Sequence, residues 1–129
     1  MAYEYGSALK ISLVAGADLS TFQYCFVGLN ASGQAVALVN ATDVPVGVLQ
    51  NKPVSGSIAE ITVIGVSKLV ADVVIAPGNV IGVGVATTPK GRATTKAATN
   101  TQVGQALSAG GAAGTIFSAL INCVAPAKN

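Results

Sequence analysis

IAEITVIGV, residues 58–66, is the stretch of the chain that most clearly indicates a fold class. Glu60 and Thr62 fall on one face of the stretch, and Ile61 and Val63 fall on the other. Because successive side chains of a β-strand point to opposite faces, this alternation predicts a strand with one face toward a core.

Further stretches share short runs of β-branched and apolar residues, bounded by Gly, Pro, Asn or Asp. They are residues 9–14, 22–29, 34–39, 44–50, 69–74, 80–85, 102–107 and 115–124. No long stretch has helical periodicity. The sequence therefore predicts an all-β subunit, a small β-sandwich or β-barrel with few or no helices.

Two segments differ from this pattern. Residues 1–20 hold one strand between Gly and Asp punctuation and are expected to form an extended N-terminal arm, ahead of a single β domain at 21–129. Residues 87–101 are small and polar, without aromatics, and are expected to be an exposed excursion with little secondary structure. In contrast, Val80 and Ile81 are apolar at consecutive positions, which is typical of strands covered on both faces. A partner subunit is one way to supply the second cover.

The composition indicates a surface that is partly buried against other chains. Charged residues make up 9% of the 129 residues and the net charge is +2, whereas soluble domains usually have about 25% charged residues. So few charges do little to keep neighbouring copies apart. A mild basic cluster at Lys90, Arg92 and Lys96 has no aromatic neighbour, so we interpret it as a solvated loop and expect no nucleic-acid partner. No apolar run is long enough to predict a membrane span, and no signal peptide is visible.

The residues that carry most enzyme chemistry are missing. The chain has no histidine, which removes the commonest general base and metal ligand, and no GxxxxGK[ST] phosphate loop. We therefore expect no catalytic, cofactor-binding or metal-binding residues. Two acids, Glu60 and Asp72, lie within predicted strands, where a charge usually marks the solvent face or an edge; an interface salt bridge is the alternative. Cys25 and Cys123 lie in apolar surroundings and are expected to be buried thiols, with a disulfide left open.

Several segments together resemble a family of phage proteins. Residues 46–53 (VGVLQNKP) resemble a "GVLQNKP" signature, and residues 59–68 (AEITVIGVSK) resemble the strand that follows it. Later segments occur in the same order: GRA at 91–93, VGQAL at 103–107 and AAGTIFSAL at 112–120. Over roughly residues 22–124 the chain is similar to the DUF2190-type capsid decoration (cement) proteins of bacteriophages.

The resemblance implies a function and partners. It implies a homotrimer, made in the host cytoplasm, that binds the major capsid protein on the outer surface of the virion head and stabilises the expanded capsid. The residues before the matched region, Tyr3, Tyr5 and Leu9, are our candidates for the capsid interface, because tyrosines near a chain end suit an anchor. Closure of the subunit's own barrel is the alternative role for these side chains. The alternative function is a tail, fibre or adhesin-like module that recognises a surface glycan or protein.

Overall fold

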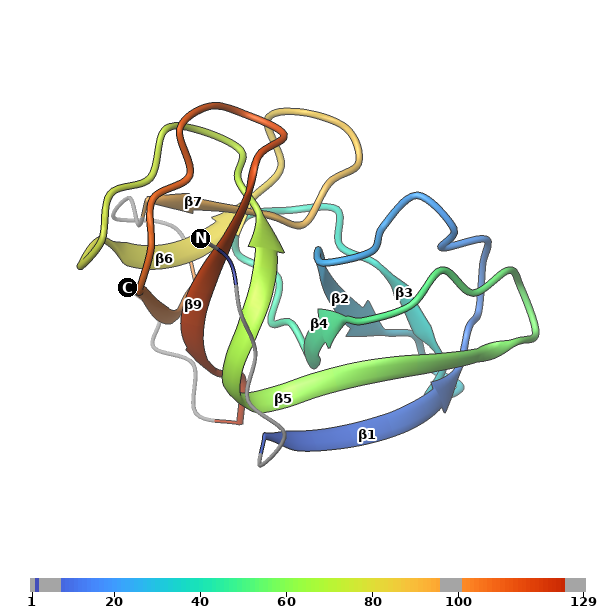
Figure 1. The fold of residues 1–129 in the computed structure, drawn as a ribbon. Coiled ribbons are helices and arrows are strands. Elements are labelled where there is room, and N and C mark those ends of the chain that lie inside the picture. Colours follow the sequence, from blue (N-terminus) through green and yellow to red (C-terminus); the bar gives the residue numbers. More distant parts are fainter. Residues whose placement is uncertain (1, 3–7, 96–100, 125–129) are drawn as a thin grey trace.

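The structure is a computed structural model that describes residues 2, 8–95 and 101–124. The described residues form an all-β fold of nine strands without a helix, as the sequence predicted (Figure 1). The strands are β1 Leu9–Val14, β2 Phe26–Leu29, β3 Ala35–Ala37, β4 Gly47–Leu49, β5 Ile58–Val70, β6 Val80–Gly84, β7 Arg92–Thr95, β8 Gln102–Ala106 and β9 Ile116–Asn122. All the strand pairings are antiparallel, in the order β3-β2-β4-β5-β9-β8-β6-β7, and β1 also pairs with β5.

Strand β5 divides the sheet into two curled halves. Its first part pairs with β1 and β4, and its second part, from Ile64 onward, pairs with β9. The strand bends sharply between the two parts (Figure 1). Gly65 lies at this point with a φ of +126°, and the Cβ of any other residue there would lie 2.7 Å from the Cβ of Ala8. A glycine is therefore required at position 65, where the pairing partner of β5 changes from β1 to β9.

Each half nearly closes on itself through an isolated bridge. In the first half, Ala15, just after β1, bridges Ala35 in β3, and in the second, Ala71, just after β5, bridges Ala93 in β7. These bridges cover part of the backbone at the outer strands, which is how small β-proteins limit exposed edges.

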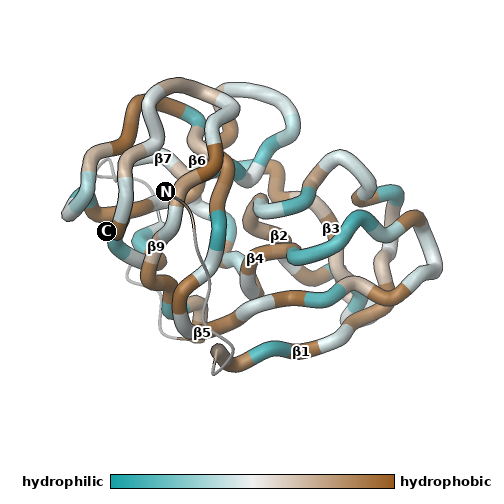
Figure 2. Tube along the Cα trace, viewed as in Figure 1, coloured by the Kyte–Doolittle hydropathy of each residue, from teal (hydrophilic) through white to brown (hydrophobic). Residues whose placement is uncertain are grey.

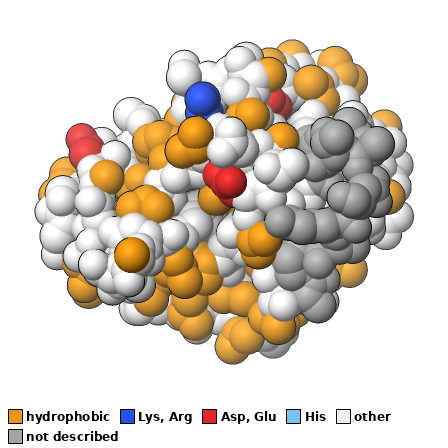
Figure 3. All heavy atoms as spheres, turned by 180° about the vertical axis from the view of Figure 1, so that it is seen from behind, with side chains coloured by type: hydrophobic (Ala, Val, Ile, Leu, Met, Phe, Trp, Pro, Cys, Tyr) orange, Lys and Arg blue, Asp and Glu red, His pale blue; other side chains and the backbone are white. Residues whose placement is uncertain are grey.

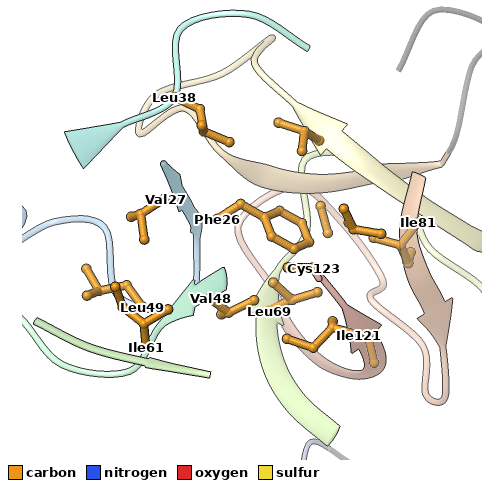
Figure 4. Close-up of a cluster of buried hydrophobic side chains, with 14 of the residues drawn as sticks. Phe26, Val27, Leu38, Val48, Leu49, Ile61, Leu69, Ile81, Ile121 and Cys123 are labelled. Atoms are coloured by element: carbon orange, nitrogen blue, oxygen red, sulfur yellow. The ribbon is translucent and has the colours of Figure 1, made fainter. Parts of the chain in front are cut away.

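One hydrophobic core runs through both halves. Phe26 lies between Val27, Leu49 and Ile61 on one side and the second-half residue Ile81 on the other (Figure 4). All five side chains are fully buried. Apolar residues follow the strands of both halves in Figure 2. The core thus joins the two halves into one domain, held by apolar burial.

Two features of the predicted strand pattern were wrong. Residues 58–66 and the start of 69–74 form the single strand β5, because the bend at Gly65 changes its direction without ending it. The segment expected to lack structure, residues 87–101, contains β7, which pairs with β6 over four residues. Its small residues permit this pairing, since Ala93 is fully buried opposite Val83.

The predicted N-terminal arm contains structure that belongs to the sheet. Strand β1 pairs with β5 along its length, and Ala15 and Leu19 are buried in the core. Tyr3 and Tyr5 lie outside the described residues, so the role of the arm stays a prediction.

Candidate functional site: an uncharged apolar face

The VGVLQNKP segment that carries the family resemblance has structural roles. The Gln50 side chain donates to the Val48 carbonyl at 3.1 Å and to the Ser67 hydroxyl at 2.9 Å, which joins β4 to the second part of β5. The Asn51 amide accepts from the Glu60 N–H at 3.0 Å and donates to the Ile58 carbonyl at 2.9 Å. These bonds continue the β4–β5 pairing beyond the last residue of β4. The segment therefore stabilises the fold.

Asp72 holds a loop in place. It is 5% exposed, so the expectation that it marks the solvent face is wrong. Its carboxylate accepts from the Ala86 N–H at 3.2 Å and from the Thr87 hydroxyl, to which Arg92 Nη1 also donates at 3.0 Å. A carboxylate is buried here because it satisfies the donors of the loop between β6 and β7. Glu60 is exposed, as predicted, and accepts from the Ser12 hydroxyl at 3.0 Å.

Both cysteines are buried free thiols, as the sequence predicted. Burial raises the pKa of the Cys25 thiol to about 11 and that of Cys123 to about 12, since an apolar surrounding disfavours the thiolate. Thiols with so high a pKa are weak nucleophiles at neutral pH. Among the described residues, no group of three or more Cys, Asp or Glu side chains is placed to hold a metal ion.

The strongest candidate for a functional surface is a row of side chains across four neighbouring strands of the second half. Val66 in β5 lies opposite Leu120 in β9, Leu120 lies opposite Gln105 in β8, and Gln105 lies opposite Val80 in β6. Leu120 is 48% exposed and Val80 is 39% exposed. We call this row the outer face.

A shallow hollow of about 340 Å³ lies along the outer face. Val80 and Leu120 line it together with the amide side chains of Gln102, Gln105 and Asn122, and no charged side chain of the described residues takes part. Ile116, at the start of β9 and 46% exposed, is a second exposed apolar side chain of the strand that carries Leu120. Charged side chains are also sparse on the side of the molecule seen in Figure 3. An uncharged apolar surface of this kind is typical of a protein–protein contact.

The sequence contained a signal for this face. Val80 and Ile81 predicted a strand covered on both sides, and Ile81 is fully buried while Val80 is exposed. The described part of the chain therefore supplies one of the two expected covers. The residues of the outer face were not among the predicted interface residues, because their alignment depends on the pairing register of four strands that are distant in sequence.

Of the three predicted interface residues, the structure describes Leu9. It is the first residue of β1 and is 51% exposed, opposite Ile64 at an irregularity in the β1–β5 register. Its exposure leaves it available for a contact. Leu9 is not part of the outer face. It lies opposite Ile64, two residues before Val66, which is the β5 residue of that face.

Comparisons with known proteins bear on the fold. No known protein family and no curated protein matches the sequence. Among solved structures, the N base of the head fibre protein gp8.5 of bacteriophage phi29 has a similar fold, with a TM-score of 0.62. The superposition covers 89% of this chain and 94% of that one at 12% sequence identity. The likeness at this identity concerns the fold. No helix in the described part of the chain is long and apolar enough to cross a membrane.

Proposed function

We propose that this protein is a capsid decoration protein of a bacteriophage, which binds the outer surface of the head and stabilises the expanded capsid without catalysing a reaction. The observation that carries the proposal is the shared fold with the base of a phage head fibre over nearly the whole of both chains. The motifs that resemble those of DUF2190-type decoration proteins agree with the proposal, although no known family matches the sequence as a whole.

The surface chemistry agrees with a binding role. The outer face presents Val80 and Leu120, and no charged side chain of the described residues lines its hollow. Burying such a face against another protein removes few charged groups from water. When several linked subunits bind equivalent positions on a head at the same time, multivalency strengthens binding through contacts that are each modest.

We further propose that the protein is a homotrimer and that the outer face is covered by a neighbouring subunit. Two copies of an uncharged face can associate without placing like charges opposite each other, which would be destabilising. The consecutive apolar residues Val80 and Ile81 predict a strand that is covered on both faces, and a neighbouring subunit would cover the face that Val80 exposes.

The proposal is tested by co-sedimentation of the purified protein with expanded heads that lack it. We expect saturation at a fixed copy number that the symmetry of the head allows, and heads that resist heat better when saturated. Absence of binding at micromolar protein would refute the decoration role. Light scattering of the free protein gives the mass of the oligomer, and a monomer at all concentrations would refute a trimer that forms before attachment.

A second candidate function is the base of a head fibre. It is favoured by the similar structure, which is the base of a head fibre. In this role the protein would also bind heads, but we expect no rise in their thermal stability. The stability measurement on saturated heads therefore separates the two functions, and a glycan array tests whether any sugar recognition accompanies the second.

A further inference from the structure

A second hollow, distinct from the outer face, lies where three separated segments of the chain meet. It has a volume of about 470 Å³ and is lined chiefly by Phe22, Ala37, Leu38, Pro89 and Lys90. Thr21 and Thr88 complete the lining, in which four side chains are apolar, and Lys90 supplies the only charge among the described residues there. We call it the Phe22–Lys90 groove.

The apolar side of the groove is fixed by close packing. A Cβ at Gly28 would lie 2.7 Å from Leu38 Cδ2, so the glycine in β2 makes room for the leucine that follows β3. Phe22 belongs to a turn in which its N–H donates to the Leu19 carbonyl and its carbonyl accepts from the Cys25 N–H, both at 3.0 Å. Phe22 is nevertheless half-buried only, although an aromatic ring of its size gains most when it is covered.

The opposite side of the groove is held by the loop that Asp72 anchors. The Asp72 carboxylate fixes Ala86 and Thr87 at the start of this loop. At its end, the Gly91 carbonyl accepts from the Phe26 N–H at 2.7 Å, and a Cβ at Gly91 would lie 2.3 Å from the Phe26 carbonyl oxygen. Pro89 and Lys90 lie between these two anchors. The groove is therefore formed before any partner binds, which lowers the entropic cost of binding.

Lys90 has a charge that the described residues do not balance. It is half-buried, no acidic side chain lines the groove, and no ion pair or hydrogen bond of its side chain is found within residues 8–95 and 101–124. A partly desolvated ammonium gains more from a carboxylate than a fully hydrated one does. The groove thus combines apolar side chains with a positive charge that no described residue pairs with.

We propose that the Phe22–Lys90 groove is the docking site for an extended segment of the major capsid protein in which an apolar side chain stands next to a carboxylate. The apolar side chain covers Phe22, Leu38 and Pro89, and the carboxylate pairs with Lys90. This inference rests on the proposed decoration function and adds the site and the chemistry of the partner segment. A single cation without a basic neighbour in the lining does not suit a phosphate backbone, which is bound by several.

The test compares charge-reversed variants for binding to expanded heads that lack the protein. Lys90→Glu places a carboxylate where the partner's carboxylate is expected, and Lys52→Glu makes the same change at an exposed lysine away from the groove. We expect Lys90→Glu to weaken head binding at least about tenfold, as removal of a partly buried charge pair does, and Lys52→Glu to bind within about twofold of the wild type. Lys90→Met, which keeps the aliphatic stem, is expected to lie between them. Thermal unfolding of each free variant checks that the fold is intact.

The outcomes separate this inference from the function on which it rests. If the wild type itself fails to bind heads, the decoration function is refuted. If the wild type binds and the folded Lys90→Glu and Lys90→Met variants bind equally well, the function stands and the groove is not the docking site. If the Lys90 variants change the oligomeric state of the free protein while bound copies per head stay the same, the groove contacts another copy of the chain, which also overturns the proposal.

Discussion

Gly104→Ala tests how closely β8 and β9 approach each other in the second half of the sheet. A Cβ at this position would lie 2.1 Å from the Leu120 carbonyl oxygen, well inside the 3.4 Å at which ordinary van der Waals contact begins. The atom it would meet belongs to the backbone of β9, so the two strands themselves must separate. Overpacking of a filled interior costs about 1–3 kcal/mol, and we expect the upper end of that range because no side chain can rotate away. For a domain of this size the loss corresponds to a fall in Tm of roughly 10 °C.

Urea unfolding followed by far-UV circular dichroism measures the effect, with the slope of the free energy against urea expected to stay constant. Gly111→Ala is the matched control, because nothing lies within 4 Å of a Cβ there and its φ is not in the left-handed region. The same substitution should leave the stability of that variant unchanged or raise it by about 0.4–1 kcal/mol through the unfolded chain. A Gly104→Ala protein as stable as the wild type would refute the close approach of β8 and β9.

Three further predictions concern the core, the anchored loop and the thiols. Phe117→Ala removes a fully buried ring and should lower the free energy of unfolding by about 3–5 kcal/mol in the same urea titration; a loss below about 1 kcal/mol would contradict its place in the core. Asp72→Ala leaves the Ala86 N–H and the Thr87 hydroxyl without their acceptor, so we expect a loss of about 2–3 kcal/mol and faster amide exchange over residues 85–91, whereas unchanged exchange there would show that the carboxylate does not hold the loop. Because burial raises the pKa of Cys25 from 9.0 to about 11, the unfolded chain loses its thiol proton at lower pH than the folded one, and the free energy of unfolding should fall as the pH rises from 9 to 11. Cys25→Ala should make that fall shallower, while Cys123, whose pKa burial also raises, still contributes to it; an equally steep fall in the variant would assign it to other groups.

The fold class was predictable because strand signals are local. The alternation of residues 58–66 and the Gly, Pro and Asn punctuation between the other runs depend on neighbours in sequence, and they located nearly all the strands. Strand β7 was missed, since its Thr and Ala residues resemble those of a loop and only the pairing with β6 makes them a strand. The sharp bend in β5 was missed as well, because the alternation around Gly65 predicts neither its φ of +126° nor its close approach to Ala8, which is distant in sequence.

The candidate surfaces were harder to predict than the fold. The outer face depends on two registers that align Val80 with Leu120 across β8, and no pattern within a single strand specifies them. The Phe22–Lys90 groove brings together residues 21–22, 37–38 and 88–90, which are separated in sequence. The local sequence therefore indicated only that Lys90 belongs to a solvated basic cluster. Asp72 was placed on the solvent face because its partners, Ala86 and Thr87, lie beyond the next strand. Its burial depends on a loop that the local sequence does not place.

A reconstruction by electron cryomicroscopy of expanded heads saturated with the purified protein tests the central claim most directly. The account predicts added density on the outer surface of the head at threefold or quasi-threefold positions, into which three copies of the two-halved β fold fit with the Phe22–Lys90 groove toward the capsid protein. Heads whose surface shows no added density, or density confined to the tail vertex, would contradict the assignment of this protein to capsid decoration.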